Sequence, residues 1–135
     1  MLTDAGPLIA LIDRRDQHHR ACMAAVNGMP RPLETVLPAL VEAMYMLGER
    51  SGWRGQEELW QLFQLRELVV AALDDVDLNR ACELMRQYRD VPMDFADATL
   101  VALAERRNQP EMFTLDRRGF LTYRLRGRRA FVLQP

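Results

Sequence analysis

Short apolar segments alternate with helical segments along this chain, and this alternation constrains the fold more than any other feature. Strands are predicted over Met1–Ala5, Leu33–Val36, Leu68–Leu73, Met112–Leu115 and Ala130–Leu133. Strands that are separated by helices pair in parallel, and the helices then cover both faces of the sheet. The sequence therefore predicts an α/β fold, a three-layer α/β/α sandwich around a mainly parallel sheet of about five strands.

The intervals between the strands contain the helical patterns. Helices are predicted over Leu8–Ile12, Gln17–Val26, Pro38 to about Ser51-Gly52, Glu57–Leu65, Asp74–Tyr88 and Asp94–Arg107. Asp16 and Thr35 each precede one of these helices, and side chains of this kind cap helix N-termini. We therefore expect both residues to act as caps.

Length and composition indicate one domain over residues 1–135. The chain is 49% hydrophobic, which is enough to bury a core. No apolar run reaches the roughly 18 residues that span a bilayer, and the N-terminus lacks the features of a secretory signal. Cys22 and Cys82 match no metal-ligand spacing and are typical of thiols in a reducing compartment. We expect a cytoplasmic protein that does not enter a membrane.

Basic residues cluster toward the C-terminal end. All 18 basic residues are arginine, and residues 106–135 carry eight of them against two acids, whereas the first 105 residues carry a net charge of −7. Guanidinium groups bind phosphate oxygens through paired hydrogen bonds. Arg124, Arg126 and Arg128 are therefore candidate RNA contacts. A genomic preference for arginine codons is the alternative, and it explains the missing lysines better than the clustering.

Four carboxylates stand where apolar segments begin or end. Asp4 and Asp116 end predicted strands, Asp97 lies in the first turn of a helix, and Glu42 lies early in another. Ligands of parallel sheets gather beyond the carboxyl ends of the strands, so we expect the four side chains to meet there. Each acid alone is explained as a helix cap, a first-turn acid, a turn former or a solvated residue. Only the ordered set favours a divalent metal site; Asp94 is expected to be a helix cap rather than a ligand.

These motifs, taken in order, resemble those of PIN-domain proteins, in particular the VapC-like ribonuclease toxins of bacterial toxin–antitoxin pairs. The resemblance covers essentially the whole chain and is carried by the segments Leu2–Leu11, Val36–Gly48, Phe95–Ala104 and Phe113–Phe120. One position departs from the family pattern, because Gly119 stands where many relatives have an additional acidic residue.

The resemblance implies a metal-dependent endoribonuclease that hydrolyses RNA phosphodiester bonds. It implies that Asp4, Asp97 and Asp116 bind Mg²⁺ or Mn²⁺ directly or through water, because these ions prefer oxygen ligands. Glu42 would position the attacking water or complete the outer coordination of the metal. Thr114 would hydrogen-bond either the substrate or a ligand carboxylate. The resemblance also implies a homodimer and a small antitoxin that blocks the acidic cleft, with the segment Arg54–Leu65 or the helix before it as the contact surface.

Two other functions remain open. A non-catalytic RNA-binding or regulatory module would keep the fold and bind RNA with strong salt dependence, but it would not cleave RNA. A phosphotransfer receiver also groups acids at strand ends. The chain has no lysine for the phosphate contact that receivers use, which disfavours this last function.

Overall fold

A computed structural model describes all residues from Met1 to Pro135. Five strands form one sheet in the order β3-β2-β1-β4-β7, and every neighbouring pair is parallel. The strands are β1 (Leu2–Thr3), β2 (Leu33–Val36), β3 (Leu68–Ala71), β4 (Glu111–Phe113) and β7 (Val132–Gln134). The central position of β1, between β2 and β4, brings the start of the chain to the middle of the sheet. The predicted parallel α/β sandwich is confirmed.

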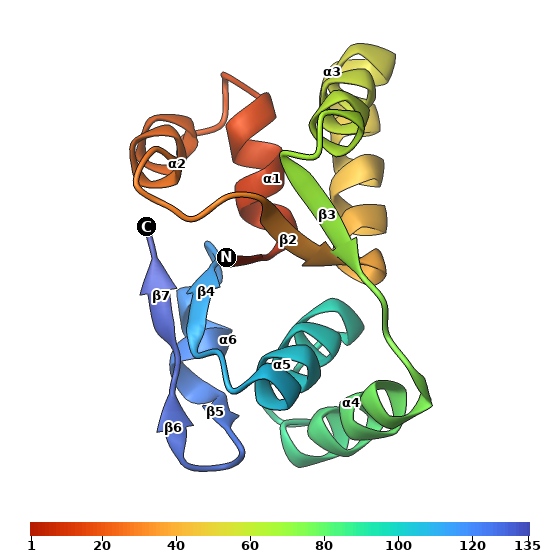
Figure 1. The fold of residues 1–135 in the computed structure, drawn as a ribbon, viewed down its shortest axis with the longest axis vertical. Coiled ribbons are helices and arrows are strands. Elements are labelled where there is room, and N and C mark those ends of the chain that lie inside the picture. Colours follow the sequence, from red (N-terminus) through yellow and green to blue (C-terminus); the bar gives the residue numbers. More distant parts are fainter.

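Six helices surround this sheet. They are α1 (Ala5–Ile12), α2 (His19–Val26), α3 (Leu37–Gln64), α4 (Asp75–Gln87), α5 (Phe95–Arg107) and α6 (Arg117–Thr122). In the view of Figure 1, α1 and α2 lie in the upper part of the molecule and α3 runs beside β3, whereas α5 and α4 pack together in the lower part. A small antiparallel hairpin, β5 (Arg124–Leu125) and β6 (Arg129–Ala130), stands apart from the main sheet.

The C-terminal region differs from the sequence prediction in two ways. Helix α6 was not predicted, because its six residues are too few for a periodic apolar pattern to be recognised. The single strand predicted over Ala130–Leu133 is instead divided between β6 and β7. Buried Phe131 separates these two strands and lets the chain pass from the hairpin into the main sheet.

Helix α3 has a sharp kink where the sequence predicted a boundary between two helices. Gly52 has φ 61° and ψ −155°, a conformation that is essentially restricted to glycine. Helical turns resume directly after Gly52 rather than at Glu57. Beyond the kink the Gln56 side-chain amide donates to the Met44 carbonyl at 3.1 Å, which ties the two halves of α3 together.

Two expected helix caps are wrong. The Asp16 carboxylate accepts hydrogen bonds from the His18 amide and the Arg50 guanidinium, but it makes no cap to α2. Thr35 lies on the buried face of β2, and its hydroxyl has no hydrogen-bond partner, so it does not cap α3. The expected cap at Asp94 is confirmed, because its side chain accepts the Asp97 amide at 2.8 Å.

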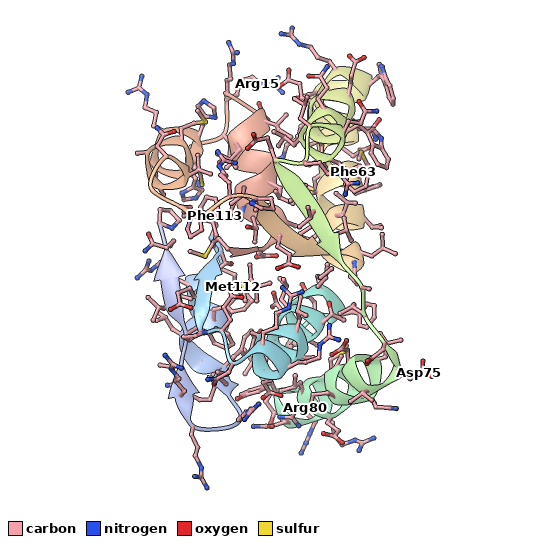
Figure 2. All side chains as sticks on the ribbon, viewed as in Figure 1. Arg15, Phe63, Asp75, Arg80, Met112 and Phe113 are labelled. Carbon is pink, nitrogen blue, oxygen red and sulfur yellow. The ribbon has the colours of Figure 1, made fainter.

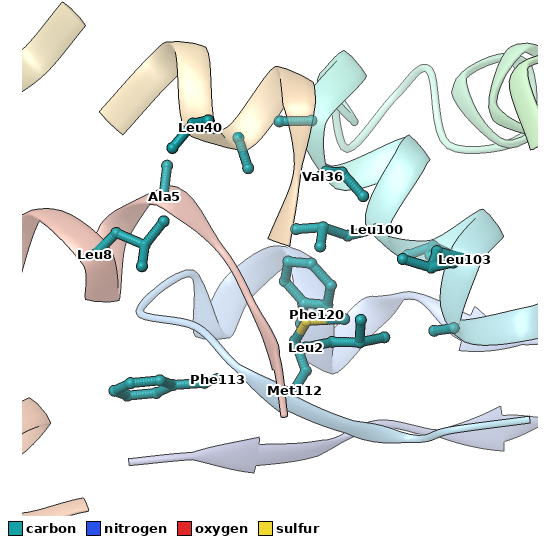
Figure 3. Close-up of a cluster of buried hydrophobic side chains, with 14 of the residues drawn as sticks. Leu2, Ala5, Leu8, Val36, Leu40, Leu100, Leu103, Met112, Phe113 and Phe120 are labelled. Atoms are coloured by element: carbon teal, nitrogen blue, oxygen red, sulfur yellow. The ribbon is translucent and has the colours of Figure 1, made fainter. Parts of the chain in front are cut away.

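The core lies between the sheet and the helices. Every residue of α5 from Ala96 to Glu105 is buried, so this helix is enclosed on all sides. Figure 3 shows Leu100 and Leu103 of this helix close to Leu2 and Phe120. Outside this cluster, Figure 2 places Arg15 and Arg80 at opposite ends of the molecule. Burial of α5 fixes the position of its first turn, which carries Asp97.

None of the helices has both the length and the apolarity that a membrane crossing needs.

Candidate active site

The structure brings the four predicted acids together where the carboxyl ends of β1 and β4 meet the starts of α3 and α5. Asp4 directly follows β1, and its amide donates to the Phe113 carbonyl of β4 at 2.9 Å. Asp97 lies in the first turn of α5 and Glu42 in the first turns of α3. Asp116 begins α6 just beyond β4. Asp94 joins them, so that five carboxyl groups interact electrostatically.

Asp4 is one of two buried acids, Asp4 and Asp97, that form the floor of this cluster. It is 8% exposed, and its carboxylate accepts the Ala5 amide at 2.6 Å and the Thr114 hydroxyl at 2.8 Å. Burial raises the pKa of Asp4, and the charges of Asp94 and Asp116 raise it further, whereas the two hydrogen bonds oppose this rise. The Thr114 hydroxyl also accepts the Asp116 amide at 3.0 Å, so it connects two of the acids.

Thr114 is itself buried. Its hydroxyl donates to the Asp4 carboxylate, which is one of the two contacts expected for it.

Asp97 is the other buried acid of the floor. It is 7% exposed, and its pKa is raised to about 8, first by burial and then by the charges of Asp94 and Asp4. The Tyr123 hydroxyl donates to Asp97 Oδ2 at 3.1 Å and opposes this shift. Asp97 thus binds a proton near neutral pH unless a cation compensates its charge.

The remaining acids form an exposed rim. Glu42, Asp94 and Asp116 are all exposed, and the pKa of Glu42 is raised by partial burial and then by the charges of Asp4 and Asp94. Beside the rim lies an open groove of about 510 Å³, lined by Glu42, Asp94 and the apolar residues Leu37, Pro38, Val41, Phe95 and Ala96.

The chemistry of these donors fits a hard divalent cation. Carboxylate oxygens are the ligands that Mg²⁺ and Mn²⁺ prefer. A bound cation would oppose both the burial and the mutual repulsion that raise the pKa values of Asp4, Asp97 and Glu42. No group of three or more His, Cys, Asp or Glu side chains is already arranged to hold a metal ion.

The three arginines expected to contact RNA lie in or beside the β5–β6 hairpin, and two of them have partners within the chain. The Arg124 guanidinium donates to the carbonyls of Leu121, Thr122 and Tyr123 at the end of α6. The Arg126 amide donates to the Glu105 carboxylate at 2.8 Å, and its guanidinium donates to the Glu105 carbonyl. Arg128 is exposed at the hairpin turn.

Sequence reasoning missed Tyr123. The residue follows α6, and nothing in the local pattern shows that its hydroxyl reaches across to the first turn of α5. Gly119 was noted only as a departure from the family pattern. Its role follows from the structure, because a Cβ at this position would lie 2.2 Å from Asp116 Oδ2.

A parallel α/β sandwich with clustered carboxylates at the carboxyl edge of its sheet defines a class of α/β proteins with an acidic site suited to a divalent metal. Within that class the chain belongs to the PIN domain family, whose model matches residues 1–124. The family expected from the motifs is confirmed.

Individual relatives extend this similarity over the full length. The chain is 27% identical over 140 residues to Ribonuclease VapC26 of Mycobacterium tuberculosis, with 100% of both chains covered. A crystal structure of M. tuberculosis VapC20, a toxin that cleaves the sarcin-ricin loop, matches with a TM-score of 0.81 at 17% identity and covers 92% of this chain and 96% of that one. A toxin–antitoxin complex from Klebsiella pneumoniae matches with a TM-score of 0.69 at 19% identity, covering 90% of each chain.

Proposed function

We propose that this chain is a Mg²⁺- or Mn²⁺-dependent endoribonuclease, built as one nuclease domain over residues 1–135, and that it is the toxin of a toxin–antitoxin pair. The observation that carries the proposal is the cluster of Asp4, Asp97, Asp116 and Glu42 at the sheet edge of a PIN-domain chain. The full-length similarity to a VapC ribonuclease supports RNA as the substrate. Such a substrate is consistent with action in the cytoplasm.

Each residue of the cluster has a separate proposed role. Asp4, Asp97 and Asp116 would hold the metal, which when bound supplies charge neutralisation and Lewis-acid activation at the scissile phosphate. Glu42 lies on the exposed rim with a raised pKa, where it orients a water molecule for attack and accepts its proton. Thr114 fixes the Asp4 carboxylate and the Asp116 backbone relative to each other through its two hydrogen bonds.

The arginine-rich segment would hold the RNA backbone. Arg128 is exposed at the hairpin turn and can reach phosphate oxygens directly. Arg124 and Arg126 add positive charge, and their hydrogen bonds also fix the hairpin to α6 and α5. Replacing Arg128 with glutamine should therefore flatten the salt dependence of RNA binding without lowering the melting temperature. An unchanged salt slope would leave codon preference as the explanation for this arginine.

Two surfaces of α3 would serve protein partners. Beyond the kink, Trp53, Trp60 and Leu65 are exposed next to a groove formed with α1 and α2, and we assign this surface to the antitoxin. Before the kink, Val41 and Tyr45 are exposed on successive turns, and we assign this face to the homodimer. Replacing Val41 and Tyr45 with serine should shift the mass in light scattering from dimer to monomer. An unchanged mass would move the interface elsewhere.

The test of the function is cleavage of RNA by the wild type and by Asp97→Asn in the presence of Mn²⁺. Asp75→Asn is the matched control, because Asp75 is an exposed acid in the first turn of α4, outside the cluster. We expect the wild type and the control to cleave and Asp97→Asn to be inactive. Binding of RNA without cleavage by the wild type would favour the non-catalytic module. Normal cleavage by Asp97→Asn would remove the carboxylate cluster as the active site.

A further inference from the structure

The Tyr123 hydroxyl is a neutral group among the five carboxylates of the site. Tyr123 is 1% exposed, and its hydroxyl donates to Asp97 Oδ2 at 3.1 Å. Its ring is fixed by edge-to-face contacts with Tyr88 and Phe120, at centroid distances of 5.1 Å and 5.3 Å. The hydroxyl therefore has a defined position, and that position is set by aromatic packing rather than by the acids.

The absence of a side chain at Gly119 makes room for this contact. A Cβ on Gly119 would lie 2.8 Å from the Tyr123 hydroxyl and 2.2 Å from Asp116 Oδ2. Real Cβ atoms do not approach other atoms this closely, so any larger residue would displace the tyrosine hydroxyl, the aspartate or both. The Tyr123 hydroxyl and the Asp116 carboxylate thus border the same small space, and the Gly119 amide donates to Asp116 Oδ1 at 3.0 Å.

We propose that Tyr123 is a positioning residue that holds the Asp97 carboxylate toward Asp116 and Asp4, and that Gly119 makes this contact possible. The hydrogen bond occupies Asp97 Oδ2 and leaves Oδ1 available to a cation. Donors of this kind orient carboxylate ligands from behind without touching the metal or the substrate. The inference rests on the proposed metal-dependent function and adds a residue to it.

A purely structural role for Tyr123 makes a different prediction. Tyr123→Phe keeps the ring and its contacts with Tyr88 and Phe120 but removes the donor to Asp97. Tyr88→Phe is the matched control, because the Tyr88 hydroxyl accepts the Arg124 amide at 3.1 Å and makes no hydrogen bond to a carboxylate. If packing alone matters, both variants will change the melting temperature slightly and neither will change metal binding.

The experiment titrates Mn²⁺ against the melting temperature of the wild type, Tyr123→Phe and Tyr88→Phe, and measures kcat and KM for RNA cleavage. We expect Tyr123→Phe to need about tenfold more Mn²⁺ for half of the stabilisation and to lose about tenfold in kcat. Its KM for RNA should stay at the wild-type value, because Tyr123 does not reach the substrate. Tyr88→Phe should match the wild type in Mn²⁺ dependence and in kcat.

A second comparison separates positioning from general disturbance. In an Asp97→Asn background, Tyr123→Phe should cause no additional loss of Mn²⁺ stabilisation, because the carboxylate that the hydroxyl positions is no longer present. An equal loss in both backgrounds would overturn the proposal. The proposal would also be overturned if Tyr123→Phe had the same Mn²⁺ dependence and the same kcat as the wild type. If the wild type neither responds to Mn²⁺ nor cleaves RNA, the proposed function fails and this inference fails with it.

Discussion

Replacing Asp97 with asparagine should stabilise the metal-free protein above mildly acidic pH. The pKa of Asp97 is raised from 3.8 to about 8, so the folded state keeps a proton that the unfolded state releases above its own, lower pKa. The free energy of unfolding must then fall as the pH rises from the pKa of Asp97 in the unfolded state to its pKa in the folded state. Above the folded-state pKa it becomes constant. The neutral asparagine does not incur this loss.

The structure gives an upper limit to the effect. Each pKa unit corresponds to about 1.4 kcal/mol, so the interval between 3.8 and about pH 7 amounts to about 4 kcal/mol. Rotation of the side chain toward the exposed rim would relieve part of this cost, and we expect about 2 kcal/mol to remain. For a chain of this length that is a rise of roughly 5–10 °C in melting temperature.

The assay is a series of thermal melts in a chelator, from about pH 5 to about pH 8.5, for the wild type, Asp97→Asn and the control Asp75→Asn. The difference between Asp97→Asn and the wild type should grow with pH, and the control should follow the wild type. A difference that is constant with pH, or that shrinks as the pH rises, would refute the argument, because it would show that the folded state does not favour the protonated carboxyl.

Four further predictions follow from other parts of the site and fold. Thr114→Val should slow cleavage by about tenfold or more through misplacement of Asp4, whereas Thr114→Ser, measured in the same assay, should retain activity because it keeps the hydroxyl. Glu105→Gln should lower the free energy of unfolding in urea by about 2 kcal/mol, because the nearly buried Glu105 carboxylate accepts two hydrogen bonds from Arg80. Gly52→Ala should cost about 2 kcal/mol in the same measurement, since alanine does not tolerate the backbone conformation at the kink. The stabilisation by a fixed Mn²⁺ concentration should increase up to about pH 8, because metal and proton compete for the raised carboxyls.

Sequence patterns that span only a few residues were sufficient to predict most of the fold. Strand β2 has the bounds expected from its apolar run, and the kink at Gly52 falls where a glycine follows a helical pattern. The hairpin was not predictable in this way, because it depends on contacts between distant residues such as Arg126 and Glu105. The arginine cluster shows the same limit, since charge alone does not distinguish a guanidinium that binds carbonyls from one that faces solvent.

Within the candidate site, local patterns revealed the four acids but not Tyr123. The four acids were visible in the sequence because each lies at the end of a strand or the start of a helix, a position that local patterns reveal. Tyr123 has no such marker. Its hydroxyl meets Asp97 because the chain after α6 brings Tyr123 next to the first turn of α5 and Gly119 leaves space for the hydroxyl. A residue that acts through another side chain is recognised only after the tertiary contacts are known.

Helix capping and membership of the acidic cluster are not alternatives in this protein. Asp94 and Asp116 each use Oδ1 to cap a helix, and in each the other oxygen, Oδ2, accepts no hydrogen bond within the chain. Asp4 also caps a helix, and each of its carboxylate oxygens has a further lone pair. The helix N-termini bring partial positive charge to the place where the carboxylates repel one another, and this offsets part of the repulsion. Parallel strands followed by helices thus provide both the crowding that a metal site needs and the amide groups that make the crowding tolerable.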